Sequence, residues 1–471
     1  MRRPVLLPHL IVAALMVAAF LATQMRLDGD SRPRGDLEDL AALAARDDLN
    51  VLFVLVDTLR ADHLGAYGYA RPTSPRIDAL AETGIRFEDH LAQSSWTKTS
   101  MSSIWTSLYP QHVGVLRSTD VISPEADLPA ETLRRAGFRT VGLWRNGWVA
   151  PNFGFGQGFE SYVTPRPGRP PEGFRRENPG FRLVGNDFDI VTSFDELLRT
   201  SGDGRWFVYA HMMDVHQYAT DEVSALFGPT YLDAYDNAIH FTDRAVDALL
   251  DLLEARDLRD RTLVVLASDH GEAFGEHGFE GHARDLHAEV TRTPWILSLP
   301  FRLDPGIVID APSENVDVWP TVFDLLGIEL DAPIDGRSLA PEIRTALARA
   351  GGAPEDAGPR APHPPRTRIA HLDRHWARAE VAPLHAVALT TDRHRLFYYP
   401  GRTDLYDRER DPAERANLAE RDPETAAALR QTVEDYLASE PVWSGGVPQV
   451  ELDDMQLGQL RALGYVVEGG R

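Results

Sequence analysis

The 471-residue chain contains no cysteine. This absence excludes disulfides, thiolate zinc sites, iron–sulfur clusters, thiol catalysis and a lipoprotein-type cysteine anchor. Basic residues are also few: 48 Lys and Arg stand against 71 Asp and Glu, so the formal charge is −23. Such an acidic surface argues against a nucleic-acid binder, which would present a basic field. An anionic substrate would therefore need local positive charge, and a metal ion would supply it.

The N-terminal segment is the least polar part of the chain. Arg2 and Arg3 precede an uncharged stretch over 4–25, and Arg26 ends it. This pattern predicts that 1–26 is a signal peptide or a single membrane anchor; a buried core helix is the alternative. Two arginines before the apolar stretch predict export to the periplasm or the outer face of the cytoplasmic membrane, with the membrane contacted through this segment.

Continuous apolar runs recur along the next three hundred residues, as expected for strands buried on both faces of a sheet. Helical patterns separate them, for example "PRIDALAETG" and "PAETLRRAG". The alternation predicts an α/β fold with a mostly parallel sheet sandwiched by helices. The four strongest runs are 51–56, 205–212, 262–268 and 294–299.

Composition divides the chain into segments. A polar stretch, 27–49, is interpreted as a linker with a short helix, and 50–350 as the main domain. The Pro- and Gly-rich break "GGAPEDAGPRAPHPPR" covers 351–366. The remaining segment, 367–471, is predicted to be a smaller C-terminal α+β subdomain.

Acidic side chains follow two of the predicted strands. Asp57 comes directly after "VLFVLV", and Asp269 and His270 come directly after "TLVVLAS". Ligands of doubly wound sheets bind at the carboxyl ends of the strands. Oxygen and nitrogen donors gathered there suit a divalent cation. The alternative is that the two Asp residues cap the helices that follow.

Several segments together resemble the sulfatase family of the alkaline phosphatase superfamily. They are "NVLFVLVDTLRADHLGAYGYARPTSPRIDALAETGIRFEDHLAQSSWT", "ASDHGEAFGEHGFEGHARDLHAEVTRTPWIL", "NVDVWPTVFDLLGI" and "TDLYDRERDPAERANLAE". They occur in the family order and cover about residues 50 to 430. The resemblance implies the sandwich fold of that superfamily and a metal-dependent ester hydrolase, with 50–350 as its sulfatase-like catalytic domain. It also implies that Asp57, Asp269, His270 and Thr97 bind one divalent ion, which would be Ca²⁺, Mn²⁺ or Zn²⁺.

The family's nucleophile lies in a Cys/Ser-x-Pro-Ser-Arg segment that precedes a Thr-Gly-x-x-Pro turn. Here the turn is "TSLYP", and the family spacing places Thr97 at the nucleophile position. Thr99 and Met101 replace the family's Pro and Arg, and no formylglycine is expected, because threonine is not converted to it. Helix capping by Thr97 is the alternative. Lys98, next in the segment, is predicted to bind substrate.

The resemblance assigns further site residues. His216 matches the histidine that contacts the ester oxygen, and His282 stands where sulfatases have a lysine, so it would protonate the leaving group or bind the anion. Arg145 and Asn146 fall near the family's Gly-Lys-Trp-His segment, where they would bind substrate.

These observations lead to a hydrolase of small anionic esters. The family implies sulfuric ester hydrolysis. Thr97 favours phosphate or phosphonate esters, because a threonine sulfate lacks the second hydroxyl that expels sulfate from formylglycine. The alternatives are a phosphoethanolamine-type headgroup transferase and a catalytically inactive binding protein on a sulfatase scaffold.

Overall fold

The computed structural model describes residues 30–452 apart from 166–184, 201, 203, 352–365 and 379. The predicted signal peptide or anchor, 1–26, lies outside the described residues. Among the helices of the described ranges, none combines the length and the apolar character that crossing a membrane requires.

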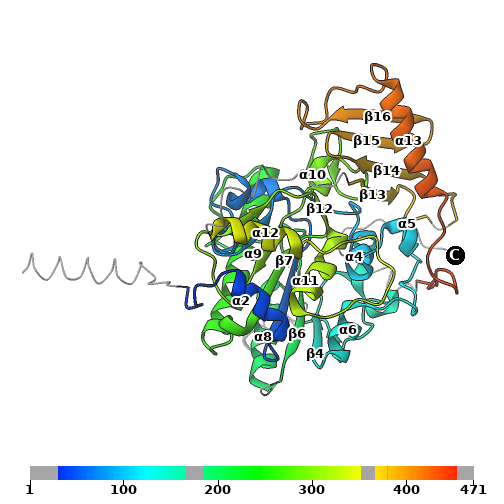
Figure 1. The fold of residues 1–471 in the computed structure, drawn as a ribbon. Coiled ribbons are helices and arrows are strands. Elements are labelled where there is room, and N and C mark those ends of the chain that lie inside the picture. Colours follow the sequence, from blue (N-terminus) through cyan, green and yellow to red (C-terminus); the bar gives the residue numbers. More distant parts are fainter. Residues whose placement is uncertain are drawn as a thin grey trace, which may run out of the picture.

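The centre of the molecule is an eight-stranded sheet with the order β11-β2-β10-β7-β1-β6-β4-β5 (Figure 1). All strands run parallel except β10, which is antiparallel to both of its neighbours. The four predicted apolar runs form β1, β6, β7 and β10, so the predicted mostly parallel sheet is confirmed. The strands are β1 (Asn50–Val56), β2 (Ile85–Phe87), β4 (Arg139–Leu143), β5 (Ser161–Val163), β6 (Trp206–Met212), β7 (Thr262–Ala267), β10 (Trp295–Ser298) and β11 (Ile307–Ile309).

Helices cover both faces of this sheet, and β1 shows the division. Val51, Phe53 and Leu55 belong to one hydrophobic core, whereas Leu52 and Val54 belong to the other. Successive residues of a strand point to opposite faces, so both faces of β1 are buried. The first core includes residues of α4 (Thr97–Thr106), α11 (Val318–Leu326) and α12 (Ala340–Ala350). The second includes residues of α3 (Pro75–Glu82), α8 (Asp187–Thr200) and α9 (Tyr231–Glu254).

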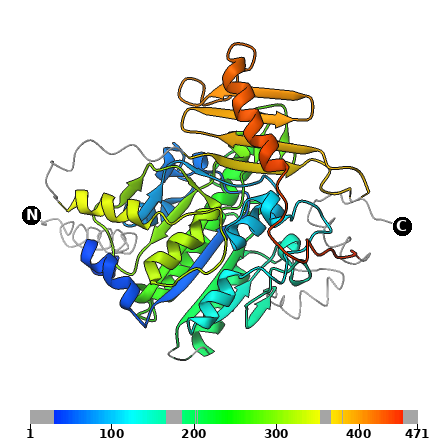
Figure 2. The same ribbon diagram turned by 45° about the vertical axis from the view of Figure 1, so that its right-hand side comes forward.

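The C-terminal part folds as a smaller α+β unit, as predicted. Four antiparallel strands follow one another in the order of the chain, and α13 (Pro423–Leu437) packs against one face of their sheet (Figure 2). The first of these strands lies nearest the catalytic part (Figure 1). The strands are β13 (Arg368–Asp373), β14 (His385–Thr390), β15 (His394–Tyr399) and β16 (Arg402–Asp407).

The described part of the predicted linker packs on the catalytic part. Arg32 is 3% exposed and donates to the backbone oxygen of Leu299. The short helix predicted in this stretch is α2 (Leu37–Ala42), which continues into a 3-10 turn, and Leu40 and Leu43 are buried. Residues 30–49, which precede β1, therefore belong to the catalytic domain.

Candidate active site

Two carboxylates and an imidazole meet at the carboxyl ends of β1 and β7. One ligand atom each from Asp57, Asp269 and His270 lies within 4.8 Å of the others, and all three side chains are buried. Asp57 Oδ1 and Asp269 Oδ2 have no hydrogen-bond partner. Buried carboxylate oxygens are costly without a partner. The three residues therefore fit a divalent cation, for which they would be the ligands.

His270 is oriented toward the same point. Its Nδ1 lies 2.9 Å from the Gly271 backbone oxygen, which only accepts, so Nδ1 carries the proton. Its Nε2 then offers a lone pair, and Thr97 Oγ1 lies 3.1 Å from it. The structure thus brings together all four side chains that the resemblance assigned to the metal.

Helix capping explains neither the acids nor the threonine. Thr97 is the first residue of α4 and Trp96 is its N-cap, with no side-chain capping bond. The two oxygens of Asp57 and Asp269 that do accept bonds serve other groups: Asp57 Oδ2 binds His211 and Asn146, and Asp269 Oδ1 binds the backbone amides of Thr58 and His270. The capping alternatives were therefore wrong.

Asp57 is held by side chains from β6 and from the loop that follows β4. Asn146 Nδ2 donates to Asp57 Oδ2 over 2.7 Å and lies 3.4 Å from Thr97 Oγ1. His211 Nε2 lies 3.0 Å from the same Oδ2, and the Tyr209 hydroxyl contacts His211 Nδ1. Because the carboxylate only accepts, His211 donates from Nε2 and accepts from Tyr209. These contacts leave Asp57 Oδ1 for a cation, and hydrogen bonds that orient a ligating carboxylate tune the affinity of a metal site.

Neighbouring histidines keep Asp57 ionised. Burial opposes the charged form, but His216, His211 and His270 together hold the pKa of Asp57 well below its usual range. Burial and the Asp57 charge instead raise the pKa of Asp269. Two buried carboxylates in contact repel each other, which a bound cation would relieve.

His216 and His282 lie beside this cluster. The His282 ring centroid is 5.0 Å from that of His216 and 4.7 Å from that of His270. Burial lowers the pKa of His216 to about 4, so its ring is neutral at pH 7. Burial also disfavours charge on His282, but Glu272, 3.2 Å from its Nδ1, raises the His282 pKa above the usual value. His216 is therefore neutral at pH 7, whereas His282 holds its proton more firmly than a free histidine does.

Arg145 is engaged with two acids. Its Nη1 lies 2.6 Å from Asp187 Oδ1 and 2.8 Å from Asp214 Oδ1, and its side chain is 8% exposed. Burial lowers the pKa of Arg145, but the two carboxylates outweigh it and raise that pKa. Burial and the Asp187 charge raise the pKa of Asp214 to about 7. The structure thus places Arg145 in a network that supports the His216 loop, and its substrate contact stays a prediction.

Lys98 is the only lysine of the chain. It is fully buried in α4, and its Nζ donates to the backbone oxygens of Ser118, at 2.7 Å, and Arg117, at 3.2 Å. The ammonium position lies 3.7 Å from the centroid of the Phe153 ring. Burial lowers the Lys98 pKa far below its usual value. Its amine thus anchors the helix that carries Thr97 to the 117–118 turn, and substrate binding by Lys98 stays untested.

A second group of possible ligands links the catalytic part to the C-terminal subdomain. His277 Nδ1 lies 2.7 Å from Glu289 Oε1, and its Nε2 lies 3.1 Å from the Ala413 backbone oxygen. The His277 and His287 rings are 3.7 Å apart and inclined by 4°. A cation cannot lie in two such ring planes at once. Acceptors face both nitrogens of His277, so an imidazolium suits this position better than a metal ligand does.

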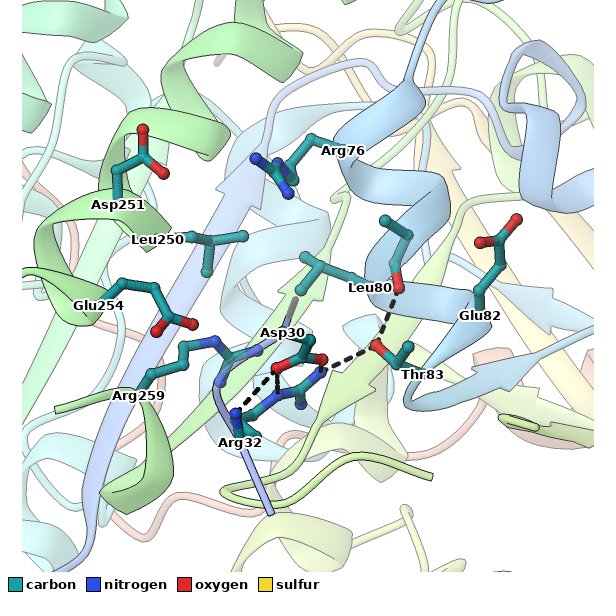
Figure 3. Close-up of a pocket in the computed structure, with 11 residues that line it drawn as sticks. Asp30, Arg32, Arg76, Leu80, Glu82, Thr83, Leu250, Asp251, Glu254 and Arg259 are labelled. Carbon is teal, nitrogen blue, oxygen red and sulfur yellow. Dashed lines mark hydrogen bonds and ion pairs between the residues drawn. The ribbon is translucent and has the colours of Figure 1, made fainter. Parts of the chain in front are cut away.

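A cavity of about 370 Å³ lies away from the cluster, between α3, the C-terminal end of α9 and the segment around residue 30 (Figure 3). None of the predicted site residues lines it. Arg32 binds Asp30 and Thr83 there, and Arg259 donates to the hydroxyl of Ser298. These contacts tie the segment around residue 30 to the rest of the catalytic part.

Known proteins resemble this chain over most of its length. The sulfatase family model matches residues 49–328. Steryl-sulfatase of Rattus norvegicus is 25% identical over 404 residues, covering 62% of this chain and 70% of the relative. N-acetylglucosamine-6-O-sulfatase of Bacteroides thetaiotaomicron is 21% identical over 504 residues, covering 83% of this chain and 87% of the relative.

Solved structures share the fold. A putative sulfatase from Bacteroides thetaiotaomicron superimposes with a TM-score of 0.67 at 18% identity, covering 83% of this chain and 92% of that one. The phosphonate monoester hydrolase of Agrobacterium radiobacter gives a TM-score of 0.65 at 18% identity, covering 86% and 100%. The family match spans more than half of the chain and includes Asp57, Thr97 and Asp269. The chain therefore belongs to the sulfatase family, whose members are ester hydrolases of the alkaline phosphatase superfamily.

Proposed function

We propose that this chain hydrolyses phosphate or phosphonate esters through a covalent intermediate on Thr97. The observation that carries the proposal is the Thr97 hydroxyl, buried where Asp57, Asp269 and His270 meet, in a chain without cysteine. A threonine phosphoester is cleaved when water attacks phosphorus. A threonine sulfate lacks the neighbouring hydroxyl that would expel sulfate. The fold likeness to phosphonate monoester hydrolases is compatible with this preference.

The first step forms the bond between Thr97 Oγ1 and phosphorus. The Thr97 proton leaves to solvent as this bond forms, because His270 Nε2 would be occupied by the cation and Nδ1 of that ring is fixed by the Gly271 oxygen. A divalent cation held by Asp57, Asp269 and His270 would lower the pKa of the hydroxyl and offset the negative charge of the ester. Asn146 would orient Asp57 and present its amide beside Thr97.

The leaving alkoxide needs a proton, and His282 would supply it. Glu272 raises the pKa of the ring against the effect of burial, which keeps the proton available at neutral pH. The P–O bond to the leaving group breaks as that oxygen is protonated. His216, neutral beside His282, would then contact a nonbridging ester oxygen.

The second step releases Thr97. Water attacks phosphorus and gives its proton to the now neutral His282, while Thr97 Oγ1 departs and takes a proton back from solvent. The cycle thus consumes one water and regenerates both groups. It uses His282 first as an acid and then as a base.

Substitution of Thr97 tests this proposal. Thr97→Ala should lower kcat by several orders of magnitude with little change in folding, and Thr97→Ser should retain part of the rate. Thr99→Ala is the matched control, because Thr99 lies in the same helix and its hydroxyl donates to the Val115 backbone oxygen instead. It should keep most of the activity.

Mass spectrometry would identify the intermediate. Brief incubation with a phosphate diester should leave a phosphothreonine on the Thr97 peptide, whereas an aryl sulfate should give no adduct or a long-lived one. Rapid turnover of an aryl sulfate that survives Thr97→Ala would overturn both the nucleophile and the phosphate preference.

Export remains a proposal based on residues 1–26. Their apolar stretch between Arg3 and Arg26 supports a location outside the cytoplasm. Fractionation of cells expressing the full chain should recover it with membranes or in the periplasm. Recovery in the cytosol with the N-terminus intact would contradict export.

A further inference from the structure

One side chain of the C-terminal subdomain, Trp376, packs beside the segment that carries the nucleophile. Trp376 lies in the connection between β13 and β14, and its ring stacks on Trp96 with centroids 4.5 Å apart and planes inclined by 25°. Trp96 directly precedes Thr97 and is fully buried. The backbone oxygen of Trp376 also accepts from Ser118 N over 2.9 Å, and Ser118 in turn accepts from Lys98 in the nucleophile helix.

The same ring contacts the residue that sets Asn146. Trp376 meets Trp148 edge to face at 5.7 Å, and Trp148 N donates to Asn146 Oδ1 over 2.9 Å. Trp96 and Trp148 also touch each other, at 5.1 Å and 77°. The three indoles thus form one unit that carries both Thr97 and Asn146 at its edges.

The third contact leads to His282. Trp376 Nε1 donates to the backbone oxygen of Ala283 over 3.3 Å, and Ala283 N donates to Ser95 O over 2.8 Å. Ala283 has a φ of 58°, a left-handed conformation that is sterically unfavourable for a residue with a Cβ. Hydrogen bonds on both sides of a strained residue hold it in place. The peptide that joins His282 to Ala283 is therefore held in place by the bond from Ala283 N to Ser95 O.

We propose that Trp376 is a positioning residue of the active site, by which the C-terminal subdomain aligns the proton donor His282 with the nucleophile Thr97. The inference rests on the proposed function, because it takes Thr97 as the nucleophile and His282 as the proton donor. Trp376 itself takes no part in the chemistry. Two observations support this role: Trp376 stacks on Trp96, and its Nε1 donates to the Ala283 backbone oxygen. Misplacement of a catalytic group by a fraction of an ångström is enough to cost rate.

The test is Trp376→Phe in the full chain. Phenylalanine keeps an aromatic contact with Trp96 but cannot donate to Ala283. We expect kcat to fall about five- to tenfold with KM nearly unchanged, which corresponds to the loss of about one net hydrogen bond. Trp443→Phe is the matched control: Trp443 Nε1 donates to the Val113 backbone oxygen over 2.8 Å and is likewise partly buried. It should leave kcat unchanged.

Esters with different leaving groups distinguish a positioning role of Trp376 from a general loss of packing in the Trp376→Phe variant. A displaced proton donor matters most for a poor leaving group, so Trp376→Phe should slow a phenyl phosphonate ester more than a 4-nitrophenyl one. In a His282→Gln background the same substitution should cost less than twofold, because the group being positioned is gone. Equal losses on both esters, or fully additive losses with His282→Gln, would overturn the proposal.

A second variant tests the strain at Ala283. Glycine adopts positive φ without steric cost, so Ala283→Gly should hold its conformation without the indole bond. In the Ala283→Gly background, Trp376→Phe should lower kcat less than threefold. A fall as large as in the wild-type background would count against the positioning role of Trp376. Survival of activity in Thr97→Ala would overturn the proposed function and this inference together. A normal Thr97 and His282 response with an inert Trp376→Phe would overturn the positioning role alone.

Discussion

Removal of one buried carboxylate gives the sharpest test of the metal site. At the 4.8 Å limit on the separation of their ligand atoms, two unit charges on Asp57 and Asp269 repel by about 3.5 kcal/mol at an effective dielectric constant of 20. A bound cation relieves this repulsion. At a cation concentration of about 100 times Kd, binding adds roughly 2.7 kcal/mol to the free energy of unfolding.

These energies convert to shifts in Tm. Unfolding entropy of about 2.1 cal/mol/K per residue amounts to about 1 kcal/mol/K for 471 residues, so the cation should raise Tm by about 3 °C. Asp269→Asn should abolish that rise. In the presence of chelator the variant should melt at or above the wild-type temperature, by up to about 3 °C, because the repulsion has been removed.

Scanning calorimetry at one fixed rate, with chelator and with Ca²⁺, Mn²⁺ or Zn²⁺, measures both effects. The control is Asp243→Asn. Asp243 is also buried, which raises its pKa to about 7, but it accepts from the Arg76 and Ile77 amides outside the cluster. That variant should keep the full cation shift. A wild-type Tm indifferent to all three cations, or a shift retained in Asp269→Asn, would refute the assignment.

Two further predictions concern side chains around the site. His211→Asn should weaken cation binding about 10- to 100-fold by titration calorimetry, because Asp57 loses a donor that orients it; unchanged affinity would contradict this role. Bonding to Glu289 raises the pKa of His277 to about 9, above the unfolded value near 6.5. The stabilisation that protonated His277 provides is therefore complete below about pH 6.5 and is lost as the pH rises through 9. His277→Gln should flatten the fall in stability between pH 7 and 10 by about 1 kcal/mol, measured by urea unfolding, since partial exposure reduces the effect. An identical pH profile in the variant would show that His277 carries no such proton.

The central sheet and the cluster of Asp57, Asp269 and His270 at its edge could be predicted because both depend on local pattern. Continuous apolar runs mark strands buried on both faces, and Asp57 and Asp269 follow two such runs directly. Parallel strands end at a shared edge, so residues distant in sequence meet there. The family spacing then placed Thr97 beside them.

The remaining residues depend on pairing and docking, which local pattern does not reveal. His211 reaches Asp57 because β6 pairs with β1 in a register that sets Leu55 opposite His211; a buried polar histidine in an apolar strand was the available signal. Trp376 lies far along the chain and contacts Trp96 only after the C-terminal subdomain has docked. Arg145 has the right charge for an anion, but its carboxylate partners come from other elements.

The single lysine makes this protein unusually easy to probe chemically. Apart from the N-terminal amine, Lys98 is the only amine that a labelling reagent can modify, and a lysine-specific protease has one possible cleavage site. All ten residues of α4 are buried, so cleavage after Lys98 requires that helix to open. The rate of this cut therefore reports the local stability of the segment that carries Thr97. A cation or an inhibitor bound at the site should slow it, and the resulting fragments of 98 and 373 residues would be resolved on a gel without any tag.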